Sequence, residues 1–424
     1  MLQETAQNCE DLDADAWRLG HLEGMFDIVS MPSAAPMHIC AALPNSRALE
    51  RWPDFPTAAL PTSGRIANGC GLTAAASRRS AIGEAVELLK TCAWGDEPVI
   101  RATVKDLGAR AIRPETLNGF SRSQIESRVQ ENRRLAGQDW IPASRRDDVP
   151  LDWMQAEDAQ TGGLLYVPAD AVLIGRRDAG DPAAVAVAES NGCACGPTVE
   201  AAKCAALMEL IERDAAGRWW YGQRRRQGLD PAILGALPEL CAYLSSRSRR
   251  FFLFNITTDL AVPVVAAASC EPDGTVVALG FAAKTNLTDA ARAATIEMLA
   301  TETSLPPWRD IGDDAVARTW VKRVCAFDLP VFADVESAVS PLPGNNTSWT
   351  LDACLATLLS RNCRVLFVDL SRRDARAPVF SAFSPELCHI RPRFGKMRLL
   401  APDALDLEQG KAGAEMPGAW PILF

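Results

Sequence analysis

The sequence predicts an α+β protein, in which helices and strands follow one another in mixed order without the strict alternation of a doubly wound parallel sheet. Three stretches have the apolar periodicity of long helices: 73–90, 198–220 and 288–303. Three apolar, β-favouring runs lie between the second and third of these helices: 250–255, 263–269 and 275–280. With 48% hydrophobic and 23% charged residues, the 424-residue chain has the composition of a globular protein with a substantial core.

The elements before the second helix are shorter. Residues 1–60 are predicted to form a lead-in of mixed helix and strand that ends in a proline-rich region, because prolines disfavour long regular elements. Thr73 is the predicted N-cap of the first long helix, since its hydroxyl accepts a hydrogen bond from a backbone N–H of the first turn. Short helices are expected over 101–143, and the apolar runs at 163–167 and 183–189 predict strands.

The elements after the second helix begin with a hairpin and end in a tail. Glu271-Pro272-Asp273-Gly274 predicts the hairpin turn, because Pro presets one turn dihedral and Gly accepts a positive φ. A further β run is expected at 364–370. We divide the chain into an N-terminal lead-in at 1–60, a main domain at 61–400 and a C-terminal tail at 401–424.

Charge and cysteine usage limit the compartment and the partners. Lys and Arg number 44 against 53 Asp and Glu, and the net charge of −9 argues against nonspecific binding to nucleic acid or to an anionic membrane. The longest apolar run, 260–270, is too short to cross a bilayer, and no export signal is expected. The 13 cysteines are scattered and do not have the spacing of a zinc site, so we expect free thiols in a cytoplasmic protein.

The most informative feature is a set of acidic residues on all three predicted long helices. Glu84 and Glu87 lie three residues apart on the first helix, and Glu209 and Glu212 have the same spacing on the second. Glu297 lies on the third helix, again among small and apolar neighbours. A spacing of three places both members of a pair on one helix face, where two like charges are destabilising unless a cation neutralises them.

Two interpretations of these acidic residues remain open. Each pair can lie on a solvated helix face with salt-bridge partners, which is the usual situation of charged residues. Alternatively, the three helices surround Mg²⁺, which prefers carboxylate oxygens and bridges to substrate phosphates, and so form a metal–nucleotide site. The apolar neighbours favour the second interpretation, because burying unpaired carboxylates is costly. A Walker loop is excluded, since Cys70-Gly71 stands where Lys and Ser or Thr are needed.

Beyond these patterns, the sequence resembles the YcaO family, and most closely the streptolysin S-type cyclodehydratases, which form azoline rings in ribosomally made peptides. The resemblance covers residues 60–400 and rests mainly on five segments: SAIGEAVE at 80–87, GDEPVIR at 95–101, ESNGCACGPT at 189–198, LMELIERDA at 207–215 and PRFG at 392–395. It implies a YcaO-like fold, with mixed sheets and helices packed around a nucleotide site. It also implies ATP-dependent phosphorylation of a backbone amide oxygen, after which a neighbouring Cys, Ser or Thr closes a thiazoline or oxazoline ring.

The resemblance also assigns roles to individual residues. Those implied to bind ATP are Ser80, Glu84, Glu87, Glu200, Glu209, Glu212, Arg213 and Glu297. Those implied to bind Mg²⁺ are Glu84, Glu87, Glu209, Glu212 and Glu297. Arg213 is expected to contact phosphate, which suits a guanidinium that donates bidentate hydrogen bonds. Phe424 is the catalytic candidate, because the terminal carboxylate or the tail is implied to assist the chemistry in several members of the family.

Departures from the family motifs leave two alternatives. Leu88, Ala201 and Ala300 stand where the motifs usually have Arg, a second acid and Gln, so one alternative is a catalytically degenerate scaffold that binds a peptide or a partner enzyme. The tail at 417–424 only approximates the alternating prolines of azoline formers. The second alternative is therefore peptide thioamidation, which uses the same ATP site with an external sulfur source.

The partners implied by the resemblance are a precursor peptide, as substrate, and an E1-like or leader-peptide-recognition protein. No stretch of the chain is predicted to form a small leader-binding domain of its own. The large apolar helical content is also compatible with a homodimer.

Overall fold

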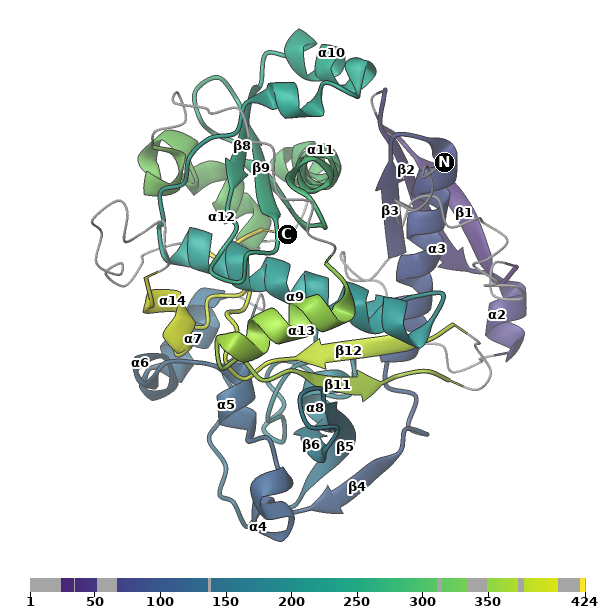
Figure 1. The fold of residues 1–424 in the computed structure, drawn as a ribbon, viewed down its shortest axis with the longest axis vertical. Helices are drawn as coiled ribbons and strands as arrows, with labels where there is room; N and C mark the ends of the chain where they lie inside the picture. The colour runs from purple at the N-terminus through teal and green to yellow at the C-terminus, as the bar shows by residue number, and fades with distance from the viewer. Residues whose placement is uncertain are drawn as a thin grey trace, which may run out of the picture.

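A computed structural model of the chain describes residues 24–33, 35–51, 67–135, 139–310, 315–333, 349–372, 377–402 and 420–423. Three sheets, each paired in antiparallel fashion, surround a long central helix, α9, at Val199–Tyr221 (Figure 1). The α+β class predicted from the sequence is therefore confirmed. The boundaries predicted at residues 60 and 400 stay predictions, and residues 1–23 and 403–419 lie outside the described part.

The first sheet supports the first acidic helix. Its strands β1 (Phe26–Met31), β2 (His38–Pro44) and β3 (Ala67–Gly71) pair in that order, and the short helix α2 (Ser46–Arg51) follows β2. Helix α3 (Ala74–Thr91) packs on β2 and β3. Thr73 caps α3 as predicted, because its hydroxyl accepts a hydrogen bond from the N–H of Ala76 at 3.1 Å.

The second sheet supports the third acidic helix. Strands β8 (Arg250–Asn255), β9 (Val264–Cys270) and β10 (Ala278–Ala283) pair in the order β10-β9-β8, and α11 (Leu287–Asp310) packs on β9 and β10. The predicted turn joins β9 to β10: Gly274 has a φ of +86°, and its N–H donates to the carbonyl of Glu271 at 2.8 Å. Strand β10 begins three residues later than the start predicted at 275.

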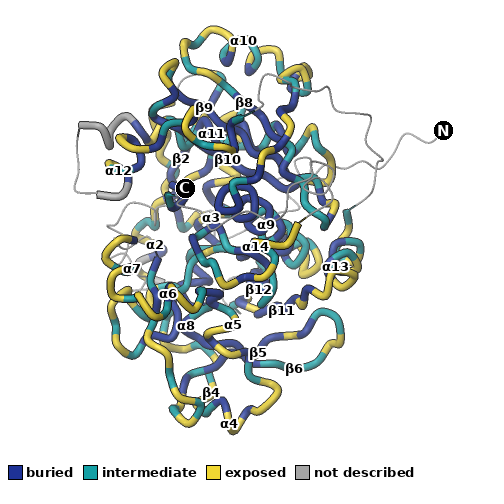
Figure 2. The backbone as a smooth tube through the Cα atoms, turned by 90° about the vertical axis from the view of Figure 1, so that its left-hand side faces the viewer, coloured by how far each residue is buried: buried dark blue, intermediate teal, exposed yellow. Residues whose placement is uncertain are grey.

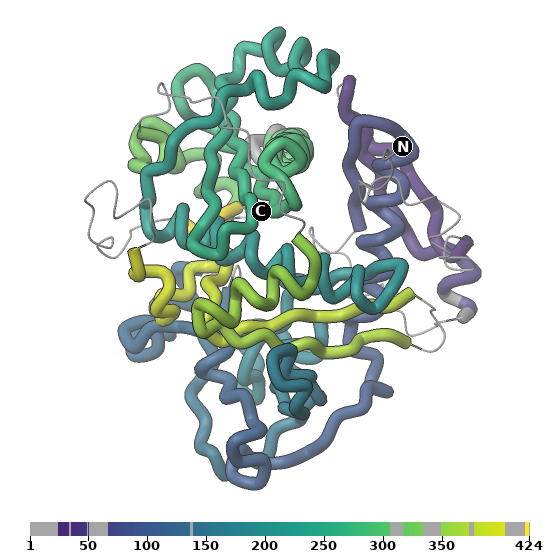
Figure 3. Tube along the Cα trace, viewed as in Figure 1, coloured from purple at the N-terminus to yellow at the C-terminus, as the bar shows by residue number. Residues whose placement is uncertain are grey.

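The third sheet lies against the central helix. Its strands pair in the order β4-β5-β11-β12-β7, with β6 also paired to β5: β4 (Val99–Ala102), β5 (Leu151–Asp158), β6 (Leu164–Pro168), β7 (Cys193–Cys195), β11 (Leu366–Asp369) and β12 (Val379–Phe383). Helix α9 packs on β12 and β7, and α13 (Leu351–Ser360) packs on α9. Figure 3 shows these late segments, in yellow-green, lying against the teal α9.

Short elements connect the three sheets. The short helices predicted over 101–143 are confirmed, and the connecting helices are α4 (Val104–Leu107), α5 (Pro114–Asn118), α6 (Arg122–Glu126), α7 (Arg128–Leu135), α8 (Ala169–Val172), α10 (Pro238–Ser246), α12 (Ala315–Arg323) and α14 (Met397–Leu400). Within the described ranges, four 3₁₀ turns complete them: η1 (Gly108–Arg110), η2 (Pro231–Leu234), η3 (Ala326–Asp328) and η4 (Pro330–Phe332).

The strand predicted at 183–189 is wrong. This segment is buried and apolar, but its backbone bonds to side chains instead of a neighbouring strand. The N–H of Val185 donates to Asp170 at 3.2 Å, and its carbonyl accepts from the side-chain amide of Asn118 at 2.8 Å. The apolar run therefore forms an ordered loop, because side chains supply the hydrogen bonds that its backbone would otherwise make to a neighbouring strand.

The main core surrounds α9 and the second sheet. Figure 2 shows buried backbone concentrated around α9, α11 and β9, whereas α10 is largely exposed. Trp219 and Trp220 are fully buried and pack against aromatic residues that include Phe254 and Trp320, so they belong to the core. All twelve cysteines in the described ranges are free thiols. In the same ranges, no helix combines the length and the apolar character that a membrane crossing requires.

Glycines allow helices and strands to approach closely at the centre. A Cβ atom on Gly69 of β3 would lie 2.0 Å from the backbone nitrogen of Ala81 on α3. A Cβ atom on Gly280 of β10 would lie 2.2 Å from the nitrogen of Met298 on α11. Both contacts are with backbone atoms, which cannot rotate away, so only glycine fits at these crossings.

We expect Gly69→Ala to lower the free energy of unfolding by about 1–3 kcal/mol, because the added methyl forces β3 away from α3. Gly83→Ala is the matched control: it lies within α3, and its Cβ would meet only the sulfur of Cys195 at 3.9 Å. Urea denaturation of both variants measures the difference. Equal stability of the two variants would contradict the close approach of β3 and α3.

Candidate functional site

Five carboxylates from the three long helices converge at the centre of the molecule. Glu84 and Glu87 come from α3, Glu209 and Glu212 from α9, and Glu297 from α11. Their mutual influence shows that they are close: the charge of Glu209 raises the pKa of Glu84, and the charge of Glu212 raises the pKa of Glu297. The structure therefore brings together side chains that are more than 200 positions apart in the sequence.

Backbone N–H groups of two strands hold four of these carboxylates in place. Glu87 accepts from Cys195 of β7 at 2.9 Å, and Glu209 accepts from Gly192, which precedes β7. On the opposite side, Glu297 accepts from Phe281 of β10 at 2.8 Å and Glu212 accepts from Ala283 at 3.1 Å. The carboxylates are thus oriented by main chain, which leaves their remaining oxygens for a ligand.

Arg213 is the guanidinium of the cluster. Its Nη2 lies 3.1 Å from Oε1 of Glu209, and its Nη1 lies 3.0 Å from Oε1 of Glu212. The side chain is only 9% exposed, and it compensates one of the five negative charges. Negative charge therefore remains in excess when all five carboxyls are ionised.

Burial shifts the pKa values of the cluster upward, and neighbouring carboxylates add to the shift for four of its members. Burial is the largest cause for every member, and it raises the pKa of Glu84 to about 7 with the help of Glu209. Burial raises the pKa of Glu212 to about 6 although Arg213 opposes the shift, and that of Glu297 to about 8 with the help of Glu212. The pKa values of Glu87 and Glu209 are raised as well. Without a cation, part of the cluster takes up protons near neutral pH.

Glu84 is the solvent-exposed member of the cluster. Its side chain reaches solvent, and burial is nevertheless the largest cause of its raised pKa. Ser80 is also exposed and lies one helical turn earlier, on the same face of α3. The face of α3 that carries both residues is therefore accessible to a ligand.

Two of the remaining predicted residues lie elsewhere or beyond the described chain. Glu200 is exposed in the first turn of α9, nine residues before Glu209 and therefore about 14 Å away along the axis and about half a turn around it. Phe424 is outside the described residues. Glu302, a further acid of α11, pairs with Arg247 at 2.6 Å and accepts from Ser269 at 2.7 Å, so it does not join the cluster.

The structure adds groups that the sequence patterns did not indicate. Cys70 of β3 lies beside the cluster, and burial together with the charges of Glu297 and Glu84 raises the pKa of its thiol to about 12. Lys284, directly after β10, lowers the pKa of Glu212. Neither residue belongs to a periodic pattern, and the backbone donors of β7 and β10 have no side-chain signature at all.

The cluster fits Mg²⁺ that is shared with phosphate better than a closed metal cage. Among the described residues, no three Asp, Glu, His or Cys side chains stand close enough to enclose a metal ion. Mg²⁺ rarely needs such a cage, because it keeps several waters and takes substrate phosphate oxygens as ligands. Buried carboxylate oxygens with uncompensated charge are the donors that such an ion prefers.

We expect the metal-free protein to lose stability as the pH rises. A carboxyl whose pKa is higher in the folded than in the unfolded chain binds protons on folding, so stability falls between its unfolded and folded pKa values. For Glu297 that interval runs from 4.5 to about 8, and Glu84 and Glu212 act in the same direction.

Calorimetric Tm values across this pH interval measure the effect. Mg²⁺ should restore the lost stability at pH 8, and Glu297→Gln should flatten the profile and remove part of the response to Mg²⁺, because the amide carries no charge. A Tm that rises from pH 5 to pH 8 without metal would contradict the uncompensated cluster.

Comparison with known proteins identifies the family. The profile described as YcaO cyclodehydratase, ATP- and Mg²⁺-binding, matches residues 68–388, which include all five carboxylates of the cluster. No curated protein matches this chain.

Three solved structures share the fold. A heterocyclase in complex with substrate and cofactor has a TM-score of 0.79 at 24% identity, over 93% of this chain and 55% of its own. The heterocyclase TruD has a TM-score of 0.67 at 22% identity, over 96% of this chain and 57% of its own. YcaO from Methanopyrus kandleri, bound with AMPPCP and Mg²⁺, has a TM-score of 0.59 at 18% identity, over 95% and 92% of the two chains.

The likeness to these structures concerns the fold, and the chain spans little more than half the length of the two heterocyclases. The family match includes all three acid-bearing helices, α3, α9 and α11. On this evidence the chain belongs to the YcaO family of cyclodehydratases, whose members bind ATP and Mg²⁺.

Proposed function

We propose that this chain is an ATP- and Mg²⁺-dependent cyclodehydratase that converts Cys, Ser or Thr residues of a ribosomally made peptide into thiazoline or oxazoline rings. The observation that carries the proposal is the gathering of five carboxylates from three helices, two of them paired with Arg213, in a chain of the YcaO family. Such a surplus of buried negative charge is costly unless divalent cations neutralise it. Mg²⁺ with a bound polyphosphate is the ligand that meets this requirement.

The residues of the cluster have distinct proposed roles. The five carboxylates would hold Mg²⁺, and Arg213 would donate to phosphate oxygens from its position between Glu209 and Glu212. Ser80 would contact the nucleotide from the accessible face of α3. Glu200, in the first turn of α9, is also proposed as a nucleotide contact.

ATP supplies the activation of the amide. In the proposed reaction the γ-phosphoryl group passes to the amide oxygen, the side-chain sulfur or oxygen bonds to the carbonyl carbon, and the amide oxygen leaves with the phosphate. The peptide therefore loses one water for each ring, and ADP and phosphate are released. The protein's part is to position the reactants and to compensate charge during phosphoryl transfer.

The tail is proposed to assist this chemistry through Phe424. The described residues just before it are fixed to the end of α9: Trp220 Nε1 donates to the carbonyl of Trp420 at 2.8 Å, and the N–H of Ile422 donates to the hydroxyl of Tyr221 at 3.1 Å. Ile422 is buried. These contacts tie the tail to the helix that carries Glu209 and Glu212, which supports a role for the tail at the site.

The proposed setting is a cytoplasmic complex. A precursor peptide is the proposed substrate, and an E1-like or leader-peptide-recognition protein is the proposed partner. The free thiols fit a reducing compartment, and a homodimer is proposed as the form of this chain.

We expect isothermal titration with ATP and Mg²⁺ to show binding that the double substitution Glu84→Ala and Glu209→Ala abolishes, because it removes one carboxylate from each of two helices. Glu115→Ala is the control: it removes an exposed carboxylate of α5, outside the cluster, and it should change binding by less than about threefold. Absence of binding in the wild-type chain, alone and with its partner protein, would favour a degenerate scaffold.

The product distinguishes cyclodehydration from thioamidation. With a Cys-, Ser- and Thr-containing precursor and the partner protein, mass spectrometry should show loss of one water per modified residue, together with release of ADP. Exchange of an amide oxygen for sulfur, dependent on an added sulfide source, would instead establish thioamidation at the same ATP site.

A further inference from the structure

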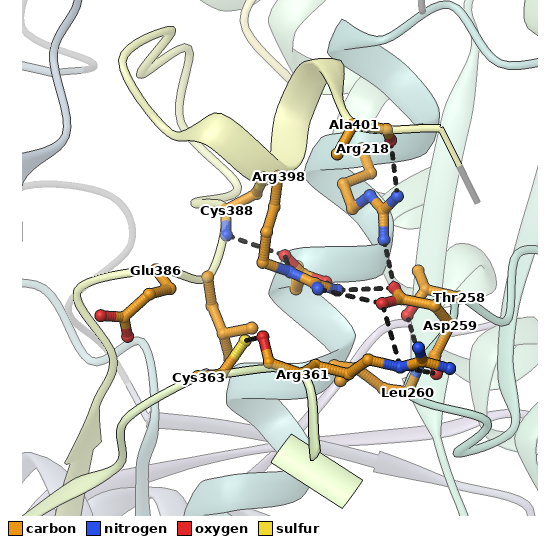
Figure 4. Close-up of polar contacts among 12 residues, drawn as sticks. Arg218, Thr258, Asp259, Leu260, Arg361, Cys363, Glu386, Cys388, Arg398 and Ala401 are labelled. Atoms are coloured by element: carbon orange, nitrogen blue, oxygen red, sulfur yellow. Dashed lines mark hydrogen bonds and ion pairs between the residues drawn. The ribbon is translucent and has the colours of Figure 1, made fainter. Parts of the chain in front are cut away.

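A network of buried ion pairs contacts α9 on the face away from the acidic cluster (Figure 4). Asp214 of α9 is fully buried and accepts a hydrogen bond from the N–H of Cys388 at 2.8 Å. Arg398 of α14 donates to both oxygens of the same carboxylate, from Nε at 3.2 Å and from Nη2 at 2.8 Å. The central helix is thereby tied to a segment that follows it by more than 170 positions.

Asp259 extends this network to the loop between β8 and β9. It accepts from Arg218 Nη1 at 2.6 Å and from Arg398 Nη2 at 2.8 Å, and Arg361 at the end of α13 lies 3.6 Å from it. Burial alone would raise the pKa of Asp259, but the hydrogen bonds and charges of Arg398 and Arg218 outweigh it and lower the pKa to about 2. The carboxylate is therefore ionised throughout the physiological range.

The network and the acidic cluster occupy opposite faces of α9. Successive residues of a helix are turned by about 100°, so Asp214 points about 140° away from Glu209, and Arg218 about 180° away. The segment that carries Arg398 also packs closely against the helix, because a Cβ atom on Gly217 would lie 2.5 Å from the carbonyl oxygen of His389. The helix thus has its ligand-binding charges on one face and its charged attachment on the other.

We propose that Asp214, Arg218, Asp259 and Arg398 form a lock that fixes the rotation and position of α9, and that they are positioning residues for nucleotide binding by Glu209, Glu212 and Arg213. The inference rests on the proposed function for its ligand. Its physical basis is repulsion: the uncompensated carboxylates of α9 face those of α3 and α11, which pushes the helices apart before a cation binds. The two carboxylates and two buried guanidiniums of the lock balance in charge, so the lock resists this movement without adding to the charge of the site.

The test compares the lock with an ion pair of similar burial elsewhere. Asp259→Asn and Arg398→Gln weaken the lock, and Arg398→Lys keeps the positive charge but loses the fork that joins two carboxylates. Asp152→Asn is the matched control: Asp152 lies on β5, pairs with Arg101 and Arg176, and is 17% exposed against 20% for Asp259. Asp259→Asn is the milder lock variant and serves if Arg398→Gln does not fold.

We expect Asp259→Asn and Arg398→Gln to weaken binding of ATP with Mg²⁺ by about tenfold at a temperature well below each variant's Tm, with an intermediate effect of Arg398→Lys. Asp152→Asn should lower the Tm comparably and leave the Kd unchanged. The effects of Arg398→Gln and Glu212→Gln on the Kd should be non-additive, because the lock acts through α9. Unchanged Kd values in the lock variants, or equal weakening in Asp152→Asn, would overturn the proposal.

A second measurement separates this proposal from the proposed function. Hydrogen exchange of residues 205–213 in the metal-free protein needs no nucleotide, and it should be faster in Asp259→Asn than in Asp152→Asn at equal distance from the Tm. If the wild-type chain does not bind ATP but this difference is seen, the proposed function fails and the lock on α9 stands. If the difference is absent, the lock is overturned whether or not ATP binds.

Discussion

The gathering of five carboxylates, four of them partly buried, near the guanidinium of Arg213 is the constraint that organises this protein. Carboxylates at this depth are tolerated only where main chain, a cation or a proton compensates them, and the structure shows the first of these directly. The strands β7 and β10 present their N–H groups to Glu87, Glu297 and Glu212. The glycine at the crossing of β10 and α11 allows the approach that the second of these contacts needs.

Each of the three sheets supports one of the acid-bearing helices, and α9 is the central one. The first sheet carries α3, the second carries α11, and the third lies beneath α9, so the acidic residues meet only when all three layers are assembled. The lock behind α9 joins its far face to the loop after β8 and to the C-terminal segment. On the face of α9 that is proposed to bind a ligand, negative charge is in excess. On the opposite face, which carries the lock, positive and negative charges balance.

The sequence predicted the elements that depend on neighbouring residues and missed the contacts between segments that are far apart in the chain. The three long helices, the Thr73 cap and the turn at Gly274 depend on neighbouring residues, and the structure confirms them. The acids were found because their spacing on a helix is visible in sequence, but the same spacing cannot show that Glu302 bonds to Arg247 instead. The loop at 183–189, Cys70 and the partners of Asp214 depend on contacts with remote segments, for which a single sequence has no local signal.

The strand order of the third sheet has a consequence for how the chain is made. Strand β5 pairs with β11, where Glu157 lies opposite Phe367, and β12 then pairs with β7. During synthesis, β5 and β7 leave the ribosome long before the two strands that join them, so their edges stay open until most of the chain has been translated. The nascent protein therefore carries open strand edges during this interval, and the third sheet is completed only when a late hairpin inserts between two early strands.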